Sequence, residues 1–149
     1  MMRNRILVLV AAVCMTMGVV AQEQTDTVAV VFDQEAVKKE AEENYEKGNK
    51  YWKAKEIDKA LTYYVLSADA GHAEAQYLLG LLCIEGKKVV QDTEKGIEWL
   101  TKAGLQGHKD AQFNLASIYL QGKLVPKDLE KAQFWAAKYK NLDTAPAEK

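Results

Sequence analysis

The side chains best suited to chemistry in this chain are those of two histidines, His72 and His108, and two cysteines, Cys14 and Cys83. The histidines occupy equivalent positions in a repeated sequence, so successive helices are expected to hold them about 8–10 Å apart or more. A zinc ion needs every ligand atom at about 2 Å. We therefore expect no shared metal site and predict that each histidine is a polar residue that opens a helix just after a glycine.

Patterns typical of catalytic or phosphate-binding sites are missing from the sequence. Cys83 lies in an apolar helical pattern with no His or Asn at a spacing that would pair with it, so a buried structural role is expected. Ser67 and Ser117 lie in no G-x-S-x-G elbow, and no GxxxxGK, GxGxxG, HExxH or CxxC pattern occurs. The acidic residues of segment 40–46 are flanked by Lys38, Lys39, Lys47 and Lys50, as on the solvated face of a charged helix. The sequence thus predicts no catalytic, cofactor-binding or metal-binding site.

The composition is that of one small soluble domain. Of the 149 residues, 48% are hydrophobic and 28% are charged, with a formal net charge of −1. Both arginines, Arg3 and Arg5, lie at the N-terminus. Nucleic-acid-binding proteins concentrate Lys and Arg on one face and use the guanidinium group for bidentate contacts. A nucleic-acid partner is therefore not expected.

Residues 1–21 have the pattern of a secretory signal peptide, with two arginines, an apolar run and the small residue Ala21. The apolar run is shorter than the roughly 20 residues that span a bilayer as a helix. We expect cleavage after Ala21, export to the bacterial periplasm or the extracellular space, and no stable membrane span afterwards. Two alternatives remain open: an uncleaved anchor, and a lipoprotein attached through Cys14. Val13 precedes Cys14 where a lipoprotein pattern has Gly or Ala.

The body of the chain repeats itself at an offset of 36 residues. The matching residues of one unit are His72, Ala75, Leu79, Gly86, Asp92, Lys95, Trp99 and Lys102, and those of the next are His108, Ala111, Leu115, Gly122, Asp128, Lys131, Trp135 and Lys138. One step earlier, the rear half of a first unit matches at Lys59, Tyr63 and Gly71, and the turn of this unit is four residues shorter. Such repeats indicate stacked units of one supersecondary structure.

Apolar residues within each unit have the spacing of helices with one buried face. Residues 75–83 place apolar side chains at i, i+3, i+4, i+7 and i+8, and the rear segments have the same pattern. Gly86 and Gly122 are suited to end the first (front) helix of a unit, and Asp92 and Asp128 to cap the second (rear) helix. The sequence predicts six helices in three hairpins.

The units resemble Sel-like repeats (SLR), relatives of tetratricopeptide repeats (TPR) with a longer internal turn. The resemblance is carried by Ala75, Leu79, Gly80, Gly86, Asp92, Lys95, Trp99 and Lys102 in one unit and by Ala111, Leu115, Tyr119, Gly122, Asp128, Lys131, Ala132 and Trp135 in the next. It implies an all-α fold, an α–α superhelix (solenoid) of three helical hairpins. This repeat domain is expected to cover residues 36–140, in units of about 36–71, 72–107 and 108–140.

Outside the repeats, residues 22–35 are expected to form a linker with a β-favouring segment, Thr27–Phe32, that could dock on something. Residues 141–149 are expected to form a disordered tail. Three residues depart from the usual repeat pattern and are expected to loosen the local packing: Cys83, Gly96 and Ala116.

The resemblance also implies a binding surface, because solenoids commonly bind partners on the concave face that their front helices line. The register of the family places these inward-facing residues on the three front helices: Glu42, Tyr45, Asn49, Trp52, Glu74, Tyr77, Leu81, Ile84, Asp110, Phe113, Ser117 and Leu120. We expect this face to bind an extended or helical segment of another protein that carries apolar anchors and some basic charge. Alternatively, the aromatic residues of this face pack against the neighbouring rear helices and have a structural role. These residues are Tyr45, Tyr77 and Phe113, which we call the aromatic column.

The predicted function is therefore that of an exported, non-catalytic scaffold for protein–protein interaction. A structural alternative is a self-associating envelope protein, because the apolar surface near Trp135 and Tyr139 needs cover from a partner, a second copy or the N-terminal segment. An enzymatic alternative, acting on β-lactams or peptidoglycan like cysteine-rich SLR proteins, finds little support because the repeated cysteine pairs of those proteins are absent.

Overall fold

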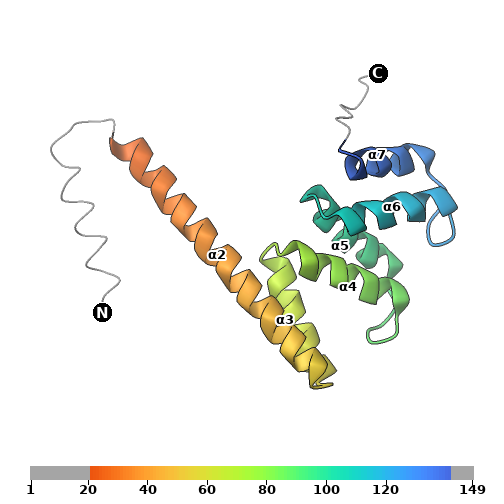
Figure 1. The fold of residues 1–149 in the computed structure, drawn as a ribbon, viewed down its shortest axis with the longest axis horizontal. Helices are drawn as coiled ribbons and strands as arrows, with labels where there is room; N and C mark the ends of the chain where they lie inside the picture. The colour runs from red at the N-terminus through yellow and green to blue at the C-terminus, as the bar shows by residue number, and fades with distance from the viewer. Residues whose placement is uncertain (1–20, 142–149) are drawn as a thin grey trace. The chain divides into compact units, whose positions relative to one another are not determined.

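Six α-helices and no strand make up residues 21–141, which is the part that the computed structural model describes, with side chains from residue 34 onward (Figure 1). The helices are α2 (Ala21–Lys53), α3 (Ile57–Asp69), α4 (Ala73–Glu85), α5 (Thr93–Leu105), α6 (Lys109–Gln121) and α7 (Leu129–Tyr139). They form the hairpins α2–α3, α4–α5 and α6–α7, which confirms the predicted all-α solenoid. The described residues divide into two units between Val37 and Lys38. The predicted leader up to residue 20, and the predicted tail from residue 142, lie outside the described residues.

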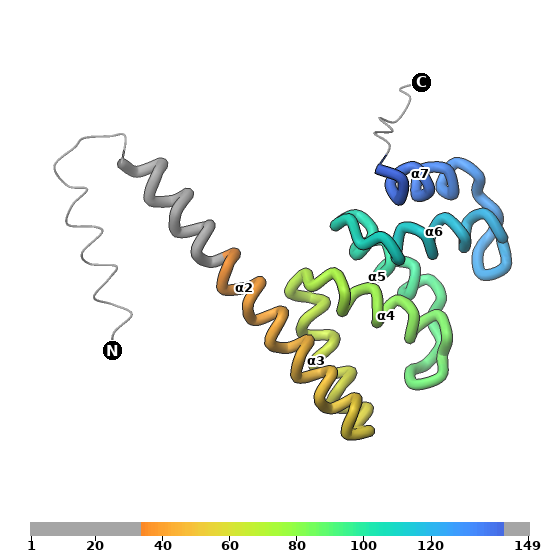
Figure 2. The backbone as a smooth tube through the Cα atoms, in the orientation of Figure 1, coloured from red at the N-terminus to blue at the C-terminus, as the bar shows by residue number. Residues whose placement is uncertain are grey.

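The turns inside the hairpins stop and start the helices as predicted. Gly86 and Gly122 end α4 and α6 with φ angles of 66° and 67°, which favour glycine. Asp92 and Asp128 begin α5 and α7, and each carboxylate accepts the N–H of the third helical residue at 2.9 Å. The turn between α2 and α3 covers residues 54–56, whereas the turns of the other two hairpins cover residues 86–92 and 122–128 (Figure 2). The first turn is therefore four residues shorter, as predicted.

Two clusters of buried side chains form the core, and each joins consecutive hairpins. The first contains Ala60, Tyr64, Ala68, Ala75, Leu79 and Trp99, and the second contains Leu100, Ala103, Ala111, Leu115 and Trp135. The first cluster therefore draws on α3, α4 and α5, and the second on α5, α6 and α7. Because no hairpin buries its apolar residues alone, the repeats fold as a stack.

The helices α4 and α5 approach each other closely at Gly80 and Gly96. A Cβ atom on Gly96 would lie 2.6 Å from Cγ1 of Ile84 and 2.8 Å from the carbonyl oxygen of Gly80. The expectation that Gly96 loosens the packing is therefore wrong, because the missing side chain lets the two backbones come together. Cys83 and Ala116, the other two departures, are half-buried and pack against the two core clusters.

We expect Gly96→Ala to lower the free energy of unfolding by about 1–2 kcal/mol. Alanine inside a helix is normally favoured over glycine by about 0.5–1 kcal/mol. Here the added Cβ collides with the carbonyl oxygen of Gly80, and overpacking of a core costs about 1–3 kcal/mol. Urea unfolding followed by circular dichroism measures the change, and Gln133→Ala on the exposed side of α7 controls for helix propensity. A more stable Gly96→Ala variant would contradict the close approach.

The helix α2 differs from the prediction for residues 22–35. The structure continues the helix through Thr27–Phe32, so this β-favouring segment is helical and does not form a strand. Strand propensity depends strongly on context, and extending an existing helix needs no new nucleus, so helix-forming flanks carry the β-branched residues along. No helix of the described residues is both long enough and apolar enough to cross a membrane.

Candidate protein-binding surface

The histidines open α4 and α6 and link each front helix to the one before it. Nδ1 of His72 accepts the N–H of Ala75 at 3.2 Å, and Nε2 lies 2.8 Å from a carboxylate oxygen of Glu42. An acceptor Nδ1 carries no proton, so Nε2 carries it and donates to the carboxylate. The next junction repeats this arrangement, with distances of 3.3 Å and 2.9 Å, through His108, Ala111 and Glu74.

These junctions make the acidic residues of the predicted binding face less available to a basic partner. These residues are Glu42, Glu74 and Asp110, which we call the acidic column. Glu42 and Glu74 are each engaged by a histidine, so a basic partner would have to compete for them. Asp110, the third member, makes no hydrogen bond or ion pair with any side chain of the described residues. The attraction of the surface for basic charge is therefore weaker than the sequence suggests.

The tyrosines of the aromatic column support the same junctions. Tyr45 stacks on His72 with ring centroids 4.6 Å apart, and Tyr77 stacks on His108 at 4.5 Å. Burial raises the pKa of both phenols, and neighbouring carboxylates, Glu74 for Tyr45 and Asp110 for Tyr77, add to the effect. Both rings therefore pack within the stack, in line with the alternative in which the column is structural.

The remaining predicted residues of α2 also contact the core. The amide oxygen of Asn49 accepts the hydroxyl of Tyr64 at 2.8 Å. The ring of Trp52 lies 6.1 Å from that of Tyr64 and packs against the first core cluster. Asn49 and Trp52 are half-buried, so α2 contributes more to packing than to an open surface.

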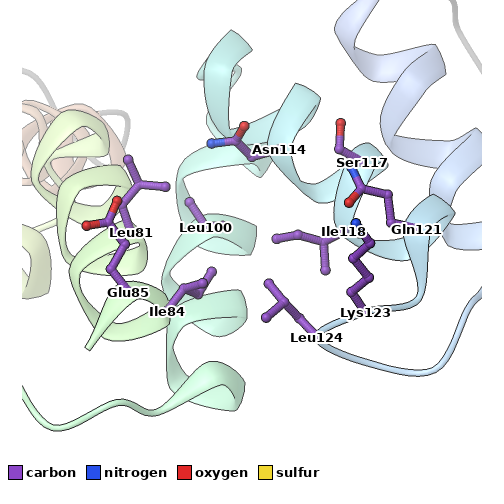
Figure 3. Close-up of a pocket in the computed structure, with 10 residues that line it drawn as sticks. All are labelled: Leu81, Ile84, Glu85, Leu100, Asn114, Ser117, Ile118, Gln121, Lys123 and Leu124. Carbon is purple, nitrogen blue, oxygen red and sulfur yellow. The ribbon is translucent and has the colours of Figure 1, made fainter. Parts of the chain in front are cut away.

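A groove opens between α4 and α6, and we call it the front groove. Its volume is about 250 Å³. Figure 3 shows Leu81 and Ile84 of α4 on one side of the groove and Ile118 and Leu124 on the opposite side, with Leu100 of α5 between the two sides. The polar residues around these apolar walls are Glu85, Asn114, Ser117, Gln121 and Lys123. The structure thus brings together three of the predicted residues, Leu81, Ile84 and Ser117.

Two predicted residues of α6 lie on a different surface. Phe113 and Leu120 are 56% and 55% exposed and line a hollow between α6 and α7, together with Ser117, which lines both sites. The ring of Phe113 lies 5.7 Å from that of Tyr139 on α7. Eleven of the twelve predicted residues therefore divide among the junctions, the core, the front groove and this hollow, and the twelfth, Asp110, belongs to none of them.

The repeated part of the chain matches the model of a known protein family. The model describes the Sel1 repeat and matches residues 41–72, 73–108 and 109–138. The chain belongs to the Sel1 repeat family. The match confirms the resemblance that the sequence suggested.

Two solved structures share the Sel1 repeat fold with this chain. A Sel1 repeat protein from Oxalobacter formigenes has a TM-score of 0.64 at 23% identity, over 80% of this chain and 91% of that chain. A protective antigen present in uropathogenic Escherichia coli strains, which displays an SLR fold, has a TM-score of 0.64 at 28% identity. That likeness covers 74% of this chain and 26% of the antigen. A comparison with curated proteins gave no match.

Sel1 repeat proteins are generally non-catalytic scaffolds that bind other proteins. Among residues 34–141, whose side chains the structure describes, there is no group of three or more His, Cys, Asp or Glu residues that could hold a metal ion. The Sel1 repeats of this chain present an apolar groove with a polar rim between α4 and α6.

Several residues of the front groove were not predicted from the sequence. Asn114, Ile118 and Gln121 lie on α6 beside the inward positions of the family register. Lys123 and Leu124 follow Gly122 in the turn between α6 and α7, which a register of front helices does not include. The repeat itself could have pointed to this turn, because Lys123 matches Lys87 at the 36-residue offset and the turn therefore belongs to the repeated unit.

We expect Cys83 to react slowly with iodoacetamide in the native protein. Burial raises the pKa of its thiol, and the nearby Asp92 carboxylate adds to the effect, so the thiolate fraction at pH 8 is low. Alkylation should be at least about tenfold slower at pH 8 than in urea-unfolded protein. Peptide mapping of timed samples by mass spectrometry measures the rate at Cys83 alone. Equal rates in the two states would contradict the buried, structural role.

Proposed function

We propose that this chain is an exported, non-catalytic scaffold whose front groove binds a segment of another protein. The observation that carries the proposal is the groove itself: the apolar side chains of Leu81, Ile84 and Leu124 converge on a solvent-accessible hollow. Apolar side chains that gather in an open groove are typical of interaction sites. The family supports a role in binding proteins.

The size and rim of the groove favour a peptide segment as its occupant. A volume of about 250 Å³ is below the roughly 300–1,000 Å³ of typical small-molecule sites. We expect an apolar anchor of the partner to insert between Leu81 and Leu124, and the amide of Gln121 at the edge of the groove can bond the backbone of an extended segment. The amide nitrogen of Asn114 already donates to the hydroxyl of Tyr77 at 3.4 Å, which leaves its oxygen for such a bond. Glu85 is already paired with Lys87 at 3.5 Å, so the anchor, rather than charge, supplies most of the affinity.

Affinity capture with matched variants tests this proposal. Leu124 is 43% exposed in the front groove, and Leu66 is 50% exposed on α3, away from the groove. We expect Leu124→Glu to abolish retention of the protein that the wild type captures, and Leu66→Glu to retain it. Fluorescence polarisation with a labelled peptide from the captured protein then gives the loss of affinity. Identical capture by both variants would contradict a role for the front groove.

Export rests on the N-terminal sequence and has its own test. We expect the protein recovered from the envelope of an expressing bacterium to begin at Gln22. Intact-mass spectrometry of the recovered protein measures this directly. A mass that includes a lipid on Cys14 would show the lipoprotein alternative, and an intact N-terminus would show the uncleaved anchor.

A further inference from the structure

The hairpin α6–α7 presents an uncovered apolar surface, which we call the end face: Phe113, Leu120, Leu129 and Tyr139. These side chains are 56%, 55%, 52% and 42% exposed, and a hollow of about 420 Å³ lies among them. In the preceding hairpin, α6 covers the corresponding surface, and Leu100 and Ala103 of α5 are fully buried there. The end face is thus built like an interface between repeats.

The opposite end of the stack has a different surface. Ala75 and Leu79 of α4 pack on the preceding hairpin, as do Ala111 and Leu115 of α6. Aligning Tyr45 with Tyr77 places Glu43 and Lys47 at these positions of α2, and both are exposed. Terminal repeats need such a polar outer surface for solubility. The α2 end meets this requirement, whereas the end face does not, which marks the end face as a contact surface.

We propose that two copies of this chain pair through their end faces about a two-fold axis. The start of α6 lies beside the end of α7, since Nζ of Lys109 donates to the carbonyl oxygens of Lys138 and Tyr139 at 3.3 Å and 2.9 Å. An axis parallel to the two helices sets α6 of one copy against α7 of the other. Phe113 then faces Tyr139 of the second copy, and Leu120 faces Leu129.

The charges at the edge of the end face fit the same symmetry. Asp110 at the start of α6 has no partner among the described side chains, and Lys140 after α7 is exposed beside the hollow. The two-fold operation brings each Asp110 to the Lys140 of the other copy, so the pair forms twice. An isologous interface requires this kind of self-complementarity, which is why we assign the end face to a second copy rather than to an unrelated protein.

The area of the end face suits a modest dimer. Four large apolar side chains, each about half exposed, offer on the order of 300–400 Å² per copy. A standard interface buries about 800 Å² per partner, of which somewhat more than half is apolar. The end face supplies most of that apolar centre, and the flanking polar residues of α6 and α7 supply the rest.

Sedimentation velocity of the purified protein tests the dimer. A concentration range of about 1–200 µM covers the dissociation constants expected for an interface of this size. We expect a concentration-dependent dimer in the wild type, and at least about tenfold weaker pairing for Leu120→Glu. Val90→Glu is the control, because Val90 is 91% exposed in the turn between α4 and α5. Circular dichroism shows whether both variants keep their helices.

Reversing the charges gives a result that loss of folding cannot imitate. Asp110→Lys should weaken the dimer, and adding Lys140→Asp in the same chain should restore it. A monomer throughout the concentration range would overturn the proposal, as would a dimer that survives Leu120→Glu. So would a dimer that is lost on Phe32→Glu but kept on Leu120→Glu, since the dimer would then form through the N-terminal half of α2 and not through the end face.

Discussion

Replacing Leu115 with alanine should lower the free energy of unfolding by about 2–5 kcal/mol. Leu115 is fully buried in the second core cluster, and its Cδ1 lies beside Gly104 of α5, where the ring of Trp135 from α7 also packs. Truncation removes contacts to two neighbouring helices at once and leaves a cavity that rigid helices fill poorly. Urea unfolding monitored by circular dichroism measures the loss.

Leu105→Ala is the matched control for Leu115→Ala. Leu105 is 61% exposed on α5, so its truncation should change the unfolding free energy by no more than about 0.5 kcal/mol. Because the core clusters join the hairpins, tryptophan fluorescence and circular dichroism should report one common transition. A Leu115→Ala variant as stable as Leu105→Ala would contradict a core shared between repeats.

Replacing His108 with alanine should cost about 2–3 kcal/mol of unfolding free energy. The change removes the acceptor for the Ala111 N–H, and loss of a helix cap costs about 0.5–2 kcal/mol. It also removes the ring that stacks on Tyr77, and such aromatic pairs contribute about 0.5–1.5 kcal/mol. The Glu74 contact is half exposed and adds little, because solvent screens it.

His108→Asn separates the two contributions, because asparagine caps a helix well but cannot stack on Tyr77. We expect it to recover about 1 kcal/mol relative to His108→Ala. A double-mutant cycle of His108→Ala with Tyr77→Leu isolates the stack, and its coupling energy should be about 0.5–1.5 kcal/mol. Strictly additive changes would contradict the junction as a single unit.

The fold could be predicted from the sequence because equivalent residues of successive repeats carry the same helix-start and helix-end signals. Gly86 and Gly122 end helices and Asp92 and Asp128 begin them, and the 36-residue echo places each pair in the same role. Local signals and tertiary stacking agree at these positions, so the helices can be predicted from a single sequence. Thr27–Phe32 lies outside the repeat and has no such signals.

The candidate site was harder to predict because it depends on which side chains meet across repeats. Glu42 was correctly placed on a front helix, but its engagement by His72 joins residues 30 positions apart and follows from the superhelix, not from spacing. Gly96 shows the same limit: its effect is decided by Ile84 and Gly80 on the neighbouring helix. Leu124 enters the front groove from a turn, where periodicity carries no information.

The junctions also bear on how the surface works. The caps, stacks and carboxylate contacts at His72 and His108 fix each front helix relative to the one before it. The walls of the front groove, formed by α4 and α6, are therefore held in place before a partner arrives. For the binding that we propose, a preformed groove would lose less entropy, so that modest apolar contacts would suffice for affinity.

Site-specific photocrosslinking tests the central claim most directly. A benzoylphenylalanine placed at Leu124 should crosslink the protein to a partner through the front groove, and the same probe at Leu66 on α3 should give no such product. Mass spectrometry of the crosslinked product identifies the joined peptides. Crosslinking from Leu66 with none from Leu124 would contradict the account.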